Sequence, residues 1–156
     1  AAGAFVAMLA TQLAYGKVDL TMVLNGALAG LVSITAEPLT PTMGWTCFIG
    51  GVGGVIVVYG VPLLDKFKID DVVGAIPVHL FAGIWGTLAV VLTNPEAALG
   101  TQIYGIVIVG VFTFVISGAA WVILNAILGI RVSEEDEITG LDTAELGMEA
   151  YPDFVR

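Results

Sequence analysis

The chain has a single histidine, His79, and it lies in "DDVVGAIPVHLFAGIWGTLAV" (70–90), where no charged side chain follows Asp71. A neutral imidazole can donate a hydrogen bond from one ring nitrogen and accept one at the other. It can therefore contact a polar solute in an apolar passage without a buried charge. It can also simply hold two helices together, through a hydrogen bond worth about 1 kcal/mol.

Helical spacing places His79 on a face of small residues. The positions three, four and seven away include Ala75, Ala82, Gly83 and Gly86, and bulkier residues fall on the other sides. Such a face meets other helices or lines a cavity, and ionisable residues inside membranes often mark ion or proton pathways. The residues alone leave both roles open, and the small-residue face favours a pathway.

The segments that position His79 have the composition of membrane helices. Of the 156 residues, 58% are hydrophobic and 12% are charged, and the mean hydropathy is +0.98. A helix needs about 20 apolar residues to cross the hydrocarbon core. Uncharged stretches cover 1–16, 20–36, 38–64, 72–95 and 97–130. We predict an all-α membrane protein in which the last four stretches can span.

The predicted helices cover about 1–16, 20–36, 43–64, 72–92 and 100–130, and a tail follows at 131–156. The first stretch would rise only about 24 Å as a helix, less than the roughly 30 Å of hydrocarbon. We therefore expect Ala1 to lie inside a helix and the chain to be the C-terminal part of a longer protein.

Counting spans places all the cations on one side of the membrane, and the cation-bearing side of a membrane protein is cytoplasmic. They are Lys17, Lys66, Lys68, Arg131 and Arg156. We predict a multi-pass protein of the cell membrane with a cytoplasmic C-terminus. The net charge of −9 gives no sign of a nucleic-acid partner, and most of the acidic residues lie in the tail.

Small and polar residues give three further local expectations. Two GxxxG patterns, in "NGALAG" (25–30) and "GGVGG" (50–54), predict close helix packing. Asp70 and Asp71 precede a span, where capping of free backbone N–H groups is the expected role of a carboxylate. Cys47 is the single cysteine and is expected to be a small buried side chain, so neither a disulfide nor a metal cluster is predicted.

Three stretches in order are similar to signatures of the ammonium transporter (Amt/MEP/Rh) family. They are "NGALAGLVSITA" (25–36), "IDDVVGAIPVHLFAGIWGTLAV" (69–90) and "RVSEEDEITGLDTAELGMEAY" (131–151). The resemblance implies an eleven-helix subunit built from two inverted five-helix repeats, normally a homotrimer with one hydrophobic pore in each subunit. This chain would supply part of the seventh helix, the eighth to eleventh helices and the tail.

The resemblance also implies roles for residues. His79 falls at the second of two pore histidines, and Thr35 is a weaker pore candidate. Asp70 and Asp71 would lie by the cytoplasmic mouth, although capping is their expected role. Leu80 follows His79 where glycine is frequent in the family, so conductance or selectivity is expected to differ.

The tail and the partners follow from the same resemblance. Gly140 and Asp142 match the "GLD" core of a tail that packs beneath neighbouring subunits and couples the pores to regulation. The implied partners are ammonium or ammonia, the lipid bilayer, two further copies of the subunit and a PII-type signalling protein. No cofactor is implied, and the implied activity is transport instead of enzymatic catalysis.

Three alternatives stay open. An ammonium sensor that signals through its tail would share the sequence features of a transporter. An intramembrane serine protease could pair Ser117 with His79, but "FVISG" lacks the first glycine of GxSG. An unrelated channel or carrier could share only the glycine-rich helices.

Overall fold

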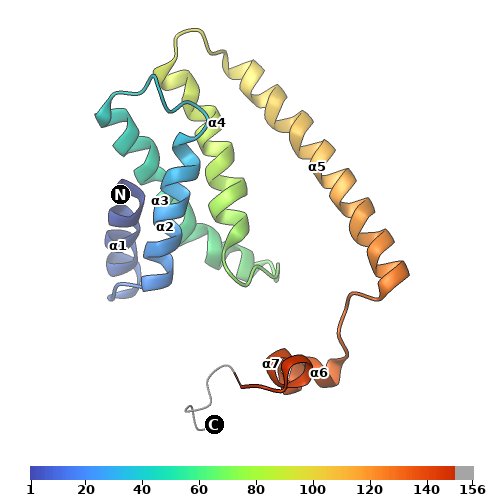
Figure 1. Ribbon diagram of the computed structural model, residues 1–156. Helices are drawn as coiled ribbons and strands as arrows, with labels where there is room; N and C mark the ends of the chain where they lie inside the picture. Colours follow the sequence, from blue (N-terminus) through green and yellow to red (C-terminus); the bar gives the residue numbers. More distant parts are fainter. Residues whose placement is uncertain (150–156) are drawn as a thin grey trace. The chain divides into compact units, whose positions relative to one another are not determined.

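The computed structural model describes residues 1–149, and every regular element in that range is a helix (Figure 1). The prediction of an all-α protein is confirmed. The predicted cytoplasmic residue Arg156 lies outside the described residues. The elements are α1 (Ala2–Tyr15), α2 (Leu20–Ile34), α3 (Met43–Lys66), the π-helical turn η1 (Ile76–Phe81), α4 (Ala82–Thr93), α5 (Leu99–Leu128), α6 (Glu134–Thr139) and α7 (Leu141–Leu146).

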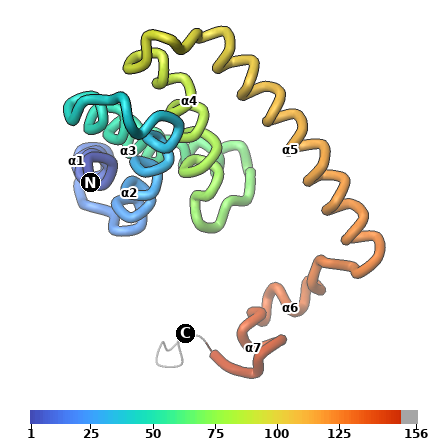
Figure 2. Tube along the Cα trace, turned by 45° about the horizontal axis from the view of Figure 1, so that its top comes forward, coloured from blue at the N-terminus to red at the C-terminus, as the bar shows by residue number. Residues whose placement is uncertain are grey.

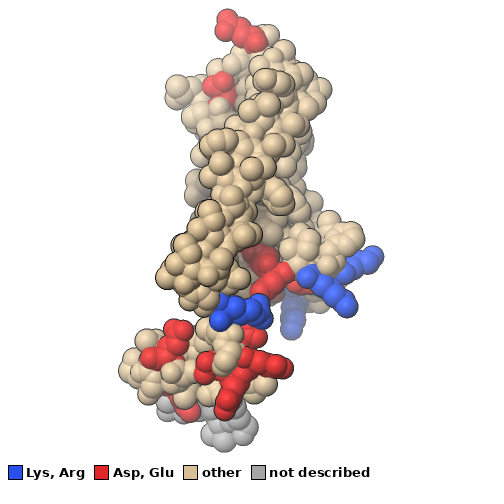
Figure 3. Space-filling model, turned by 90° about the vertical axis from the view of Figure 1, so that its right-hand side faces the viewer, with Lys and Arg blue, Asp and Glu red and all other residues tan. Residues whose placement is uncertain are grey.

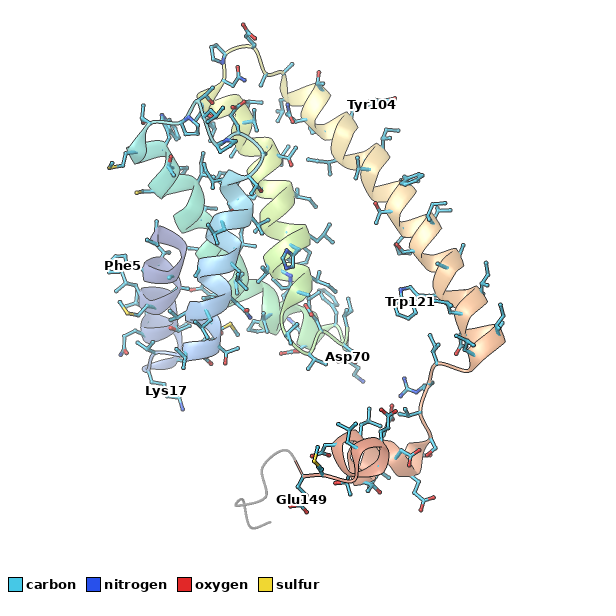
Figure 4. The ribbon with its side chains drawn as sticks, in the orientation of Figure 1. Phe5, Lys17, Asp70, Tyr104, Trp121 and Glu149 are labelled. Atoms are coloured by element: carbon cyan, nitrogen blue, oxygen red, sulfur yellow. The ribbon has the colours of Figure 1, made fainter. Side chains whose placement is uncertain are left out.

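The chain divides into two compact parts, Ala1–Ile108 and Val109–Arg156, which we describe separately. In the first part α1, α2 and α3 pack against one another, and η1 and α4 pack against α2 and α3 (Figures 1 and 2). Successive helices alternate in direction, so the connections 16–19 and 67–75 lie at one end of this bundle (Figure 1). Lys17 and Asp70 both lie at that end (Figure 4).

Three helices are long and apolar enough to cross a membrane: Met43–Lys66, Ile76–Thr93 and Leu99–Leu128. The predicted span at 20–36 is shorter than expected. The Asp19 carboxylate accepts a hydrogen bond from the Met22 N–H at 3.0 Å and starts α2 at Leu20, and the helix ends at Ile34 before the proline-containing connection. A helix of 15 residues rises only about 22 Å.

Glycines let α1, α2 and α3 approach one another closely. A Cβ on Gly3 would meet the Gly26 carbonyl oxygen and would lie 3.0 Å from both the Gly30 Cα and the Gly50 carbonyl oxygen. A Cβ on Gly54 would likewise meet the Gly3 carbonyl oxygen. Both predicted GxxxG patterns therefore converge on one glycine of α1, and the close packing they predicted is present.

Cys47 is exposed, so the expectation of a buried cysteine is wrong. It lies in the first turns of α3, where residues 43–48 are all exposed and burial begins only at Ile49. An apolar sequence predicts that a helix avoids water, but packing within the chain depends on where neighbouring helices end.

In the second part of the chain, the acidic tail forms two short helices, although its composition alone favours disorder. Ser133 caps α6 by accepting from the Asp136 N–H at 3.1 Å, and Arg131 pairs with Glu137 at 2.7 Å. Acidic side chains gather over α6 and α7 in Figure 3. The charge-free helix α5 has no buried residue in the structure.

Candidate functional site around His79

His79 lies in η1, where two buried side chains are followed directly by two exposed ones. The side chains of Pro77 and Val78 are buried, whereas those of His79 and Leu80 are exposed, Leu80 at 52%. The imidazole is therefore not enclosed by the helices of the bundle in Ala1–Ile108. It is accessible to a solute or to a partner helix.

The small residues with which helical spacing grouped His79 differ in burial, since Ala75 is exposed and Gly83 is partly exposed. Ala82 and Gly86 are buried, and a Cβ on Gly86 would meet the Ser33 carbonyl oxygen of α2. A π-helix closes i→i+5 hydrogen bonds, so residues before and after the turn do not keep the α-helical phase. His79 differs from Ala82 and Gly86 in exposure, and the face that they share by helical spacing stays a prediction.

The buried side of η1 is anchored on α3. A Cβ on Gly60 would lie 2.9 Å from the Pro77 Cβ and 3.3 Å from the Phe81 Cδ2. Val78 joins a core cluster with Ala29, Val57 and Ala82. Only a glycine at position 60 leaves room for the proline, and this packing fixes which side of η1 faces inward.

Asp71 caps the start of η1 with both of its carboxylate oxygens. Its Oδ1 accepts from the Ala75 N–H and its Oδ2 accepts from the Ile76 N–H, each at 2.8 Å. Its neighbour Asp70 is exposed, and its side chain forms no hydrogen bond with the described residues. Capping is the role predicted for both aspartates, and the structure shows the capping contacts at Asp71.

Asn25, which no sequence pattern singled out, joins α2 to the turn before His79. Its Nδ2 donates to the Val73 carbonyl oxygen at 3.0 Å. The adjacent Gly74 has φ of +75°, and a Cβ there would lie 2.9 Å from the Asn25 Nδ2. The available signal was the single amide side chain in the uncharged segment 20–36, because a polar group in such a segment requires a partner.

The structure does not bring Thr35 near His79. Thr35 ends α2, and its Oγ1 donates to the Val32 carbonyl oxygen at 2.6 Å. It lies at the end of the bundle opposite the connection 67–75, which leads into η1 (Figure 1).

In the second part of the chain, Gly140 and Asp142 form the junction between α6 and α7. Gly140 has φ of +98°, and the Asp142 Oδ1 accepts from the Thr143 N–H at 2.9 Å. A Cβ on Gly140 would lie 2.8 Å from that same oxygen. Glycine is therefore required here both by the backbone angle and by the neighbouring carboxylate.

Comparison with known proteins identifies the family. Residues 1–151 match the Ammonium Transporter Family. The chain belongs to this family. The resemblance seen in the three sequence motifs is thereby confirmed, and the expected class of multi-pass membrane protein agrees with it.

Several named ammonium transporters are similar to the chain. Ammonium transporter Amt2 of Archaeoglobus fulgidus is 42% identical over 99% of this chain and 37% of its own length. Amt1 of Haloferax mediterranei is 36% identical over 99% of the chain and 31% of its own length. The chain thus spans about a third of the length of the curated ammonium transporters it matches.

Proposed function

We propose that the protein containing this chain conducts ammonium or ammonia across the cell membrane through a hydrophobic pore, and that His79 lines the pore. The observation that carries the proposal is an exposed imidazole on a firmly packed turn, in a member of the ammonium transporter family. The same proposal has His79 paired with a second pore histidine from another part of the protein.

An imidazole suits this passage because ammonium is costly to bring into an apolar pore, whereas ammonia is small and neutral. A neutral imidazole can accept from an N–H of the solute at one nitrogen and donate from the other. His79 would then guide ammonia, and a proton could pass separately along the imidazoles. Leu80, exposed beside it, would narrow the passage.

The remaining assignments are parts of the same proposal. The connections at 16–19 and 67–75 face the cytoplasm, because the cations of the bundle lie in or beside them. Asp70 and Asp71 lie by the cytoplasmic mouth of the pore, and Thr35 is a weaker pore candidate. Three subunits form a homotrimer.

The tail would carry regulation. We propose that the junction at Gly140 and Asp142 couples neighbouring subunits and that a PII-type protein docks on the cytoplasmic face. The ordered turn between α6 and α7 supports this role, because it presents a defined shape for a partner.

Two other functions would give different results. A sensor would bind ammonium and signal through the tail with little flux. A serine protease would need Ser117 on an exposed elbow, but Ser117 lies within the continuous helix α5, so this reading has little support.

Uptake of labelled methylammonium by cells expressing the full-length protein tests the proposal. We expect the His79→Ala variant to lose most of its uptake. The control Asn125→Ala, at an exposed position of α5, should keep its uptake. Normal uptake by His79→Ala would remove His79 from the mechanism. No uptake by the unsubstituted protein, despite folded protein in the membrane, would favour the sensor.

A further inference from the structure

We propose that Asp71 and Asn25 act together as positioning residues, which fix the direction in which His79 projects from the bundle. This inference rests on the proposed function, since the orientation of His79 affects transport only if the imidazole lines the pore. Neither residue needs to touch the solute.

Asp71 fixes the backbone that leads into η1. Besides its carboxylate bonds to the Ala75 and Ile76 amides, its carbonyl oxygen accepts from the Gly74 N–H at 3.2 Å. The Gly74 carbonyl oxygen accepts in turn from the Val78 N–H at 3.2 Å. This chain of hydrogen bonds runs from Asp71 to the residue that precedes His79.

Asn25 ties the same turn to a different helix. Its hydrogen bond to the Val73 carbonyl oxygen comes from α2, and α2 also contributes Ala29 to the core around Val78. The turn is therefore held at both ends, by an amide of α2 on one side and by the packed core on the other. Without the amide, the turn would be held only by the Asp71 hydrogen bonds and by the packing of Pro77 and Val78.

The orientation of His79 depends on these contacts because the boundary between buried and exposed side chains lies between Val78 and His79. A small rotation of η1 would redirect the imidazole. A displacement of about 1 Å at a reacting group can lower a rate by roughly 100-fold. We therefore expect loss of either contact to lower transport while leaving His79 itself unchanged.

Nuclear magnetic resonance of the full-length protein labelled with 15N-histidine tests the orientation directly, with the His79 ring signals assigned by their loss in His79→Ala. We expect Asp71→Ala and Asn25→Ala to shift these signals and to lower methylammonium uptake per folded protein by roughly tenfold or more. Asp71→Asn keeps one acceptor oxygen. Its signal shift and its uptake should therefore fall between those of Asp71→Ala and those of the unsubstituted protein. The matched controls Asp65→Ala and Asn125→Ala, both at exposed positions, should leave signals and uptake unchanged.

Unshifted His79 signals in Asp71→Asn and Asn25→Ala would overturn the inference, and these two variants decide the matter if Asp71→Ala does not fold. Shifted signals with unchanged uptake per folded protein, where His79→Ala abolishes uptake, would also overturn it. Shifted signals together with full uptake by His79→Ala would instead overturn the pore role of His79 and leave its positioning intact.

Discussion

Gly86 of α4 lies directly against the backbone of Ser33 in α2. A Cβ on Gly86 would meet the Ser33 carbonyl oxygen and would lie 2.9 Å from both the carbonyl carbon and the Cα. Ser33 is also held from the other side, because a Cβ on Gly53 would meet its Oγ. Three helices thus converge on one serine, which is 1% exposed.

We expect Gly86→Ala to destabilise the protein by about 1–3 kcal/mol, because the added methyl group overlaps backbone atoms that cannot move independently. The midpoint of thermal unfolding of the full-length protein in detergent measures this effect. Gly83→Ala is the matched control on the same helix, since its Cβ would meet only the Val32 Cγ1 at 3.7 Å. Equal midpoints for the two variants would contradict the close contact.

Gly54→Ala tests the convergence of the GxxxG patterns on Gly3. Its Cβ would meet the Gly3 carbonyl oxygen and lie 3.0 Å from the carbonyl carbon, so a loss of about 1–3 kcal/mol is expected. Gly105→Ala in α5 has nothing within 4 Å and should be neutral or slightly stabilising. Chemical unfolding of the two variants side by side measures the difference, and a tolerated Gly54→Ala would show that α1 can shift.

Trp85→Phe removes one hydrogen bond while keeping an aromatic ring. The Trp85 Nε1 donates to the Ile49 carbonyl oxygen at 2.9 Å, and its ring packs edge-on against Phe48 with centroids 6.3 Å apart. We expect a loss of about 1 kcal/mol in the free energy of unfolding. The control Trp121→Phe, on the exposed surface of α5, should change stability little. A similar loss of stability in both variants would show that it comes from removing a tryptophan from the membrane and not from the lost hydrogen bond.

Gly140→Ala should loosen the junction of α6 and α7. Its φ of +98° is strained for any residue with a Cβ, and that Cβ would crowd the Asp142 carboxylate. A cost of about 1–3 kcal/mol is expected, visible as faster amide hydrogen exchange across 134–146. Exchange that stays as slow as in Gly100→Ala, a helical glycine with no atom within 4 Å, would be the contrary result.

Composition and local spacing were enough to predict the apolar helices, the close helix contacts and the family. Long uncharged stretches predict apolar helices because an α-helix makes all of its backbone hydrogen bonds within one segment, as lipid requires. Glycines four residues apart, such as Gly26 and Gly30, predict close packing because small residues on one helix face let the backbones of two helices approach. The quoted motifs were sufficient to indicate the family.

The exposure of His79 depends on how the helices pack and could not be predicted from the sequence. Helical periodicity assumes uniform α-winding, so it could not anticipate the π-helical turn Ile76–Phe81 that contains His79. The bond from Asn25 to Val73 joins residues 48 positions apart, and no local pattern encodes it. Adjacent carboxylates look alike in a sequence, but the fold aims only that of Asp71 at the free amides, because a cap depends on backbone direction as well as on residue type.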